Sequence, residues 1–302
     1  MASMRSIIYI SGSGRSGSTL LERILHSSPS VTALGELHCL WRMPTHEITC
    51  SCGSPFQDDM LWQEILEHAR FDTSTIAELR RLESRVCRSG FVARHRFSLE
   101  SLGADPEVQA FLDLQSSLFD SIKIVSGTSV LVDSSKAGPR AWILASDPRV
   151  ALVHLHRDPA EVMASWRSTK FDPGMGRAMK RMPIHSAALD WWKVEQLISR
   201  LGRVYPVARI DYQALCSAPH AIVSAMLAEL GLSEELTPNW ISSNQIEPGP
   251  EYHSLNGNPD RFSKSAIQVT ARGIDWSNVA PVERPAIRVL ASALRSLCPA
   301  ET

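Results

Sequence analysis

A glycine-rich segment near the start of the sequence combines residue types that suit the binding of a small anion. The segment Gly12–Thr19 reads GSGRSGST and separates a short apolar run from a helical apolar pattern. A turn between a strand and a helix presents unpaired backbone N–H groups and the positive end of the helix dipole, which together attract phosphate or sulfate. Arg15 adds a cation, and Ser16, Ser18 and Thr19 add hydroxyl donors. The segment therefore predicts an oxyanion site, the alternative being a tight turn without a ligand.

The same glycines fit two other nucleotide-binding patterns. Gly12, Gly14 and Gly17 match the Gly-x-Gly-x-x-Gly fingerprint of dinucleotide-binding folds, and Glu36 lies near the distance at which a ribose-binding acid is expected. The segment also has Walker A spacing, but Ser18 occupies the position of the lysine that grips the β- and γ-phosphates. A magnesium-dependent triphosphatase is therefore disfavoured, whereas a NAD(P)-dependent oxidoreductase stays open as an alternative.

A second candidate anion site lies at a helix start in the middle of the chain. Asp158 can cap this helix, Pro159 suits its first turn, and Glu161 stands where a capping box needs an acid. Ser165 follows the cap by nearly two turns, so it returns to the same face about 10 Å along the axis. Arg157 and Ser165 could therefore hold one phosphate from two sides, although a purely structural cap is the alternative.

Several short apolar runs that end abruptly in polar residues predict the buried strands of a parallel sheet. They are Ile7–Ile10, Val31–Leu34, Val130–Val132, Val150–Leu155 and Val207–Ile210. Helical patterns lie between them, and this alternation predicts an α/β fold with a P-loop-like open parallel sheet flanked by helices. In such sheets ligands bind beyond the carboxyl ends of the strands. The residues expected there are Ser11–Thr19, Glu36, Asp133–Lys136, Arg157–Asp158 and Asp211–Tyr212.

Residues 40–120 have a different character from the rest of the chain. Amphipathic helical patterns fill this stretch, and Gly90–Arg94 is its one weak candidate for a strand. We expect a single domain over residues 1–302, in which residues 40–120 form a helical insertion after the second strand.

Composition and charge exclude several classes of partner. The 302 residues include 31 Lys and Arg against 32 Asp and Glu, so no general attraction to nucleic acid or to an anionic membrane is expected. No apolar run approaches the roughly 20 residues that span a bilayer, and we find no signal-peptide pattern. The six cysteines are scattered and predict no disulfide framework, which favours a reducing cytoplasmic location. The sequence does not specify the oligomeric state.

Both candidate anion sites resemble motifs of one enzyme family. Arg15–Leu21 resembles the 5′-phosphosulfate-binding loop of sulfotransferases that use 3′-phosphoadenosine-5′-phosphosulfate (PAPS), especially the bacterial, glycan and tyrosyl-protein branches. The steroid and phenol branch is less similar, because its loop carries lysines. Arg157 and Ser165, with the intervening Asp-Pro, are similar to the 3′-phosphate-binding motif of that family. The resemblance implies a PAPS-dependent sulfotransferase that binds its donor through Arg15, Ser16, Gly17, Ser18, Thr19, Arg157 and Ser165.

The resemblance also implies a general base. Sulfuryl transfer depends mainly on positioning and charge stabilisation, and it needs a base but no metal ion. Glu36 follows the second predicted strand, and in tyrosyl-protein and bacterial sulfotransferases a glutamate at a similar place is the base. We therefore expect Glu36 to take the proton of the acceptor hydroxyl, the alternative being an ordinary loop carboxylate or an ion-pair partner of Arg15.

A lysine after the third predicted strand is a further catalytic candidate. Asp133–Lys136 reads Asp-Ser-Ser-Lys, and bacterial members of the family often show a similar segment. Lys136 could stabilise the bridging oxygen alongside Arg15 as the product 3′-phosphoadenosine-5′-phosphate (PAP) departs, with Asp133 orienting the basic groups. The alternative is a surface lysine.

A third likeness lies near the carboxyl end of the chain. Gly257–Phe262 reads GNPDRF, and bacterial family members often carry Gly-Asn-Pro-x-Arg-Phe. Related enzymes close over the nucleotide with a basic loop, so Arg261 is the main candidate for this contact and Arg272 the second. A solvated loop is the alternative.

Histidines and cysteines do not predict a metal site. His154 and His156 alternate within a predicted buried strand, which favours a structural role. Cys39, Cys50 and Cys52 supply only three thiols without a paired Cys-x-x-Cys element, so no metal is expected.

The acceptor is not identified by any motif. A small molecule, a glycan or a peptide tyrosine would each fit, with Trp41, Trp62 and the helices up to Phe119 either covering an acceptor pocket or filling the core. A non-catalytic nucleotide-binding protein is a third class, although Glu36 and Lys136 argue against it.

Overall fold

The computed structural model describes residues 5–43, 47–271 and 273–298, and its centre is a five-stranded parallel sheet. The strand order is β2-β3-β1-β4-β7. The strands are β1 (Ile7–Ser11), β2 (Val31–Ala33), β3 (Val130–Lys136), β4 (Val150–His156) and β7 (Val207–Asp211). The predicted α/β fold with an open parallel sheet is confirmed, and all five predicted strands form.

The two faces of the sheet are built by alternate residues of each strand. On β1, Ile7 and Tyr9 pack with one hydrophobic cluster, and Ile8 and Ile10 pack with another. This period of two lets a continuous apolar run serve both faces. The second cluster is covered by α1 (Ser18–His26), α11 (Tyr212–Ser217) and α12 (Pro219–Leu230). The first is covered by α8 (Gly138–Leu144), α10 (Ile184–Leu201) and the inserted helices.

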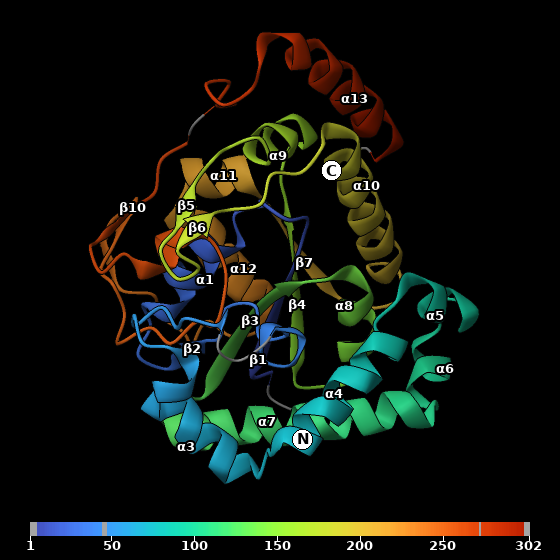
Figure 1. Ribbon diagram of the computed structural model, residues 1–302, viewed down its shortest axis with the longest axis vertical. Coiled ribbons are helices and arrows are strands. Elements are labelled where there is room, and N and C mark those ends of the chain that lie inside the picture. Colours follow the sequence, from blue (N-terminus) through green and yellow to red (C-terminus); the bar gives the residue numbers. More distant parts are fainter. Residues whose placement is uncertain (1–4, 44–46, 272, 299–302) are drawn as a thin grey trace.

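The stretch between β2 and β3 is helical, as predicted. Figure 1 shows its longer helices, α3, α4 and α7, lying together below the sheet. The helices are α2 (Cys39–Arg42), α3 (Met60–Ala69), α4 (Thr73–Val86), α5 (Ser89–Arg94), α6 (Leu99–Gly103) and α7 (Pro106–Ser126), with the 3-10 turn η2 (Phe56–Asp58).

One predicted strand in this stretch is wrong. Gly90–Arg94 lies within the helix α5. Phe91 and Val92 are buried next to each other, whereas the residues on either side are exposed. Two adjacent buried residues fit the period of a helix and not the alternation of a half-buried strand.

A third hydrophobic cluster joins α9 (Pro159–Ser165) to α10 and to α13 (Arg284–Leu297). Two small sheets complete the chain, one of β5 (Phe171–Asp172) and β6 (Arg177–Ala178), the other of β8 (Trp240–Ser242), β9 (Gln245–Ile246) and β10 (Ile267–Gln268). The remaining 3-10 turns are η3 (Pro259–Phe262) and η4 (Pro281–Glu283). Among the described residues, no helix has the length and apolar character needed to cross a bilayer.

The central strand gives a direct test of the packing. Ile8 is fully buried and lies opposite Val132 of β3 and Ala151 of β4. Ile8→Ala should lower the free energy of unfolding by about 2–5 kcal/mol, because it leaves a cavity between sheet and helices. Ile124→Ala is the matched control, since Ile124 on α7 is 63% exposed, and it should change stability by less than about 0.5 kcal/mol. Urea titration measures both, and equal costs would contradict the assigned core.

Candidate active site

The loop between β1 and α1 is held in a compact shape by two aromatic side chains. Gly17 precedes α1 with φ 99°, and a Cβ atom there would lie 2.3 Å from the ring of Tyr212. A Cβ atom on Gly14 would lie 2.5 Å from the ring of Trp166. Only glycine fits these two positions, because the rings occupy the space that a side chain needs. The amino end of α1, which has no side-chain cap, therefore opens into the space in front of the loop.

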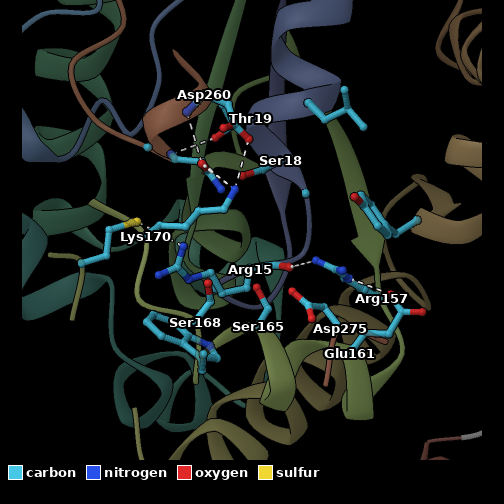
Figure 2. A pocket seen from close by; sticks show the side chains of 18 of the residues that line it. Arg15, Ser18, Thr19, Arg157, Glu161, Ser165, Ser168, Lys170, Asp260 and Asp275 are labelled. Atoms are coloured by element: carbon cyan, nitrogen blue, oxygen red, sulfur yellow. Dashed lines mark hydrogen bonds and ion pairs between the residues drawn. The ribbon is translucent and has the colours of Figure 1, made fainter. Parts of the chain in front are cut away.

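That space is a cavity of about 770 Å³, and most of the predicted site residues surround it. Figure 2 shows their side chains coming from the first loop, from the β4–α9 junction and from later segments of the chain. The predicted residues that line it are Arg15, Gly17, Ser18, Thr19, Glu36, Lys136, Arg157 and Ser165. Residues far apart in the sequence thus face one another across a single cavity.

Arg15 has hydrogen-bonding capacity to spare. Its guanidinium lies 4.9 Å from the centre of the Trp166 ring, and Nη1 lies 3.2 Å from the sulfur of Met179. Its buried Nη2 has no partner among the described residues, and neither has the buried Oγ of Ser16 beneath the loop. Burial lowers the pKa of Arg15, and nearby Arg157 acts in the same direction. An anion in front of the loop would accept from Nη2 and relieve the repulsion between the two cations.

Arg157 is fixed by contacts on several sides. Its Nη1 donates to the backbone oxygen of Arg15 at 2.8 Å, and its Nε donates to Glu161 at 2.9 Å. Its guanidinium stacks on Tyr212 at 4.2 Å, and its own carbonyl accepts from Trp191 at 2.8 Å. The hydrogen bond to Arg15 couples the second predicted anion site directly to the first.

The helix that follows Arg157 begins as the sequence predicts. Asp158 caps α9 by accepting from the backbone N–H of Ala160 at 2.8 Å, and Arg295 of α13 pairs with its carboxylate at 2.7 Å. Glu161, expected in a capping box, instead accepts from Arg157 and from Gln213. Ser165 is the last residue of α9 and lines the cavity.

Glu36 and Lys136 form the charged centre of the cavity. Lys136 Nζ donates to Glu36 Oε1, and it lies 3.4 Å from Ser18 Oγ of the first loop. Asn256 donates to the other oxygen of Glu36 at 3.4 Å. Burial raises the pKa of Glu36 and is the largest single influence, but the charge and hydrogen bond of Lys136 and the charge of Arg261 act together against it, so the pKa lies below the ordinary value. Glu36 is therefore an ionised carboxylate whose ion-pair partner is Lys136 and not Arg15.

His38, close to Glu36, has a different state. Its Nε2 lies 3.9 Å from Glu36 Oε2, and burial lowers its pKa to about 4. The imidazole is therefore neutral near pH 7. Glu36 remains the ionised group of this pair.

A buried acid that the sequence did not single out positions Glu36. Glu22 of α1 accepts from the backbone N–H of Gly35 and, at 2.7 Å, from Ser134 Oγ. Gly35 has φ 69°, and a Cβ atom there would lie 2.1 Å from Ser254 Oγ. Burial raises the pKa of Glu22 to about 7. The one feature of the sequence that could have revealed Glu22 is its position between Leu21 and Ile24, on the apolar side of a helix.

The segment after His253 crosses in front of the first loop. Asn256, Gly257 and Asn258 line the cavity, and the backbone N–H of Asn258 donates to Thr19 Oγ1 at 3.2 Å. The sequence missed the contact between Asn256 and Glu36, although the surrounding motif marked the segment as important.

Arg261 is placed differently from its predicted contact with the nucleotide. Its side chain is buried, pairs with Asp172 at 3.5 Å and donates to the carbonyl of Gly257 at 2.9 Å. Among the described residues, the set that lines the cavity does not include it. Arg261 thus holds the Gly257 segment in place, and Arg272, the second candidate, lies outside the described residues.

Three cations that no motif marked also line the cavity, one of them Lys180. Lys170 follows α9, and its Nζ lies 3.4 Å from Asp260. Arg23 of α1 donates to the carbonyl of Ser263 at 2.8 Å. A lysine in a polar stretch or an arginine on an amphipathic helix is ordinary in sequence, so only the folded chain places them here.

The paired histidines of β4 have structural partners. His154 and His156 each lie 3.1 Å from the carboxylate of Glu195 on α10. These two bonds lower the pKa of Glu195 to about 2 in spite of its burial, which acts the other way. The predicted structural role of the histidines agrees with this arrangement.

Comparisons with known proteins found one family profile and several solved structures. The profile of the sulfotransferase family matches residues 7–236. The chain is similar to the sulfotransferase domain of the Synechococcus PCC 7002 olefin synthase, with 20% identity, a TM-score of 0.41, and 77% of this chain and 75% of that chain covered. The sulfotransferase domain from the curacin biosynthetic pathway is 18% identical, with a TM-score of 0.48, and 98% of this chain and 98% of that chain are covered. A sulfotransferase of Mycobacterium tuberculosis H37Rv is 15% identical, with a TM-score of 0.41, and 76% of this chain and 68% of that chain are covered. No curated protein matches the chain.

The buried Glu22 predicts a pH dependence of stability. Its pKa is 4.5 in a solvated chain and about 7 in the fold. Between these values the folded chain holds more protons than the unfolded chain, so stability falls as the pH rises through this window, by on the order of 3 kcal/mol. Glu22→Gln can still accept from Gly35 but does not titrate, and it should abolish this loss.

Urea unfolding at about pH 5 and about pH 7.5 measures the effect, which lies within the window of linkage. Glu229→Gln, at an exposed position of α12, is the control and should keep the wild-type pH dependence. An unchanged pH dependence in Glu22→Gln would show that Glu22 does not cause it.

Proposed function

The chain belongs to the sulfotransferase family, and we propose that it transfers a sulfuryl group from PAPS to an acceptor hydroxyl. The observation that carries the PAPS assignment is the coupling of two cationic anion sites in one cavity. Arg157 donates to the backbone of Arg15, so both guanidinium groups belong to one rigid unit. A donor with phosphate groups at both ends of its ribose fits such a pair.

We assign the 5′-phosphosulfate to the first loop. Arg15 Nη2 is buried without a partner among the described residues, and Ser18 and Thr19 begin α1 and line the cavity, whereas Ser16 is buried and does not line it. These donors and the free backbone N–H groups of the helix start suit an oxyanion. Gly14 and Gly17 let the chain approach it closely, which supports the fit.

We assign the 3′-phosphate to Arg157 and Ser165. Two of the three guanidinium nitrogens of Arg157 bond to the backbone of Arg15 and to Glu161. The contacts with Glu161 and Tyr212 orient the group before any ligand arrives, which reduces the entropy lost on binding. Ser165, at the far end of α9, lines the same cavity and supplies a hydroxyl donor.

In the proposed reaction, Glu36 accepts the proton of the acceptor hydroxyl. The acceptor oxygen forms a bond to sulfur, and the bond between sulfur and the 5′-phosphate oxygen breaks, with its electron pair leaving on PAP. Lys136 reaches both Glu36 and Ser18, so it lies between the base and the loop. From there, Lys136 and Arg15 would stabilise the negative charge that develops on the departing oxygen.

We propose that later segments of the chain form the acceptor side of the cavity. Trp41 and Trp62 are buried in the core, and the described lining residues include none between Glu36 and Lys136. The lining on this side comes from Lys170–Lys180 and Gly273–Asn278 in part. We propose that these segments receive the hydroxyl of a small molecule, a glycan or a peptide.

The dinucleotide alternative does not account for the ion pair of Glu36. In that alternative the acid binds a ribose hydroxyl, whereas here Glu36 pairs with Lys136 inside the cavity. The alternative also leaves Arg157 and Ser165 without a function.

Nucleotide binding tests the donor assignment. PAP should bind without Mg²⁺ about 10–100 times more tightly than ADP, because only PAP carries a 3′-phosphate for Arg157. Arg157→Ala should weaken PAP binding by about the same factor and leave ADP binding nearly unchanged. Arg203→Ala, at an exposed position, is the control. Isothermal titration calorimetry measures the affinities of all three proteins for both nucleotides, and equal binding of PAP and ADP by the wild type would remove the 3′-phosphate site.

The base is tested by turnover. Glu36→Gln should lower the rate of sulfuryl transfer by about 10²–10⁴ and change PAP affinity by less than about threefold. Labelled PAPS and a panel of phenols, glycans and tyrosyl peptides give the rate, with Glu229→Gln as the control. Normal turnover in Glu36→Gln would reassign the base to another group.

A further inference from the structure

Four side chains with metal-binding atoms converge outside the cavity. Cys50, Cys52, Asp59 and His253 each offer one such atom, and these atoms all lie within 4.8 Å of one another. The set comprises two thiols, one carboxylate and one imidazole. Thiolate and imidazole together are the ligands that proteins use for zinc, whereas Mg²⁺ and Ca²⁺ take oxygen ligands.

The distances within this group are close to those of a tetrahedral site. Cys50 Sγ lies 3.6 Å from His253 Nδ1, Cys52 Sγ lies 3.4 Å from Asp59 Oδ2, and His253 Nδ1 lies 2.8 Å from the same oxygen. Bonds of about 2.0–2.3 Å to a central zinc place the ligand atoms of a tetrahedron about 3.3–3.8 Å apart. Two of the three separations fall in this range, and the third is shorter because His253 and Asp59 bond to each other directly, so an ion would replace that hydrogen bond.

The backbone presents both thiols on the same side of a tight turn. Cys50 donates to the carbonyl of Ser54, and Gly53 donates to the carbonyl of Cys50, both at 2.9 Å. Gly53 has φ 104°, which glycine adopts without strain. The Cys-Ser-Cys-Gly sequence is thus folded back on itself independently of any ion.

The acid and the histidine are oriented by contacts outside the group. Asp59 Oδ1 caps α3 by accepting from Leu61 and Trp62, which leaves Oδ2 for the cluster. Trp62 Nε1 anchors the backbone of His253 by donating to its carbonyl at 2.9 Å, and Nε2 of the His253 ring lies 3.7 Å from Glu251 Oε2. Such outer hydrogen bonds fix the direction of metal ligands in proteins.

Two chain segments are held in register around the cluster. The backbone N–H of Ser51 donates to the carbonyl of Ser254 at 3.0 Å, and the N–H of Ser254 donates to Ser51 Oγ at 2.8 Å. Cys50 and Asp59 are buried, whereas Cys52 and His253 are partly exposed and give an ion a path of entry.

We propose that Cys50, Cys52, Asp59 and His253 bind a structural Zn²⁺ ion, with release of the thiol protons to solvent. The ion would fasten the turn at 50–59 to the segment that begins at His253. Because Asn256 and Asn258 of that segment contact Glu36 and Thr19, zinc would stabilise the wall of the cavity. Zinc binding does not depend on the proposed reaction.

The prediction of no metal site rests on the three thiols of Cys39, Cys50 and Cys52 alone. Cys39 belongs to another group, with Glu36 and His38, whereas His253 stands 194 residues from Asp59. The separation in sequence hid the fourth ligand.

Metal content tests the proposal. Wild-type protein purified from zinc-supplemented medium under reducing conditions should contain about one Zn²⁺ per chain by mass spectrometry, as one four-ligand site requires. The Cys50→Ser/Cys52→Ser double variant should contain no zinc. The control Cys298→Ser, which replaces the cysteine directly after α13, should retain its zinc. Zinc retained in the double variant, or absent from the wild type, would overturn the proposal.

A titration of the wild type covers the case in which the double variant does not fold. Chelator-treated protein should lose roughly 5–10 °C of thermal stability, and Zn²⁺ but not Mg²⁺ should restore it. Co²⁺ should give the thiolate charge-transfer absorption and the visible bands of a tetrahedral site. A cluster held together by hydrogen bonds alone would give no charge-transfer band. Absence of that band in fully reduced protein would therefore overturn the proposal.

Discussion

The arrangement of the site depends on how the first loop is tied to the strands on both sides. The backbone N–H of Gly12 donates to the carbonyl of Lys136 at the end of β3, at 3.3 Å, and the carbonyl of Arg15 accepts from Arg157 after β4 at 2.8 Å. Parallel strands end at one edge of a sheet, so these two bonds fix the relative positions of the segments that carry Arg15, Lys136 and Arg157. The placement of Glu36 follows, because Lys136 binds it.

A buried charge network supports this edge from below. Arg140 of α8 is fully buried and bonds to Asp133 of β3 at 3.2 Å, to Gln115 of α7 at 2.5 Å and to Glu83 of α4 at 3.4 Å. Such a network gains little net stability, because desolvation of the ions offsets their attraction, but loss of one partner leaves a costly buried charge. Asp133, expected to orient Lys136, instead links the inserted helices to the sheet.

The fold and the main anion sites could be predicted because their signals are local. The first strand and the glycine, arginine and hydroxyl residues that follow it can be recognised within about fifteen residues, and the five short apolar runs specify the sheet. The partners of Arg261, Glu22 and Cys50 could not be predicted, since Asp172, Gly35 and His253 meet them only through tertiary packing. The strand prediction for Gly90–Arg94 is wrong for a different reason. So short a segment has too few residues to show whether its apolar positions follow the period of a helix or of a strand.

The glycines of the first loop constrain how relatives of this chain can diverge. Gly14 and Gly17 cannot be replaced by larger residues while Trp166 and Tyr212 fill the space that a methyl group would need. At Gly14 a larger residue becomes tolerable when Trp166 is replaced by a smaller side chain, whereas Gly17 is strained for any other residue by its φ of 99°. Among homologous chains, Gly14 and Trp166 should therefore be exchanged as a couple, and Gly17 should persist whatever side chain faces it.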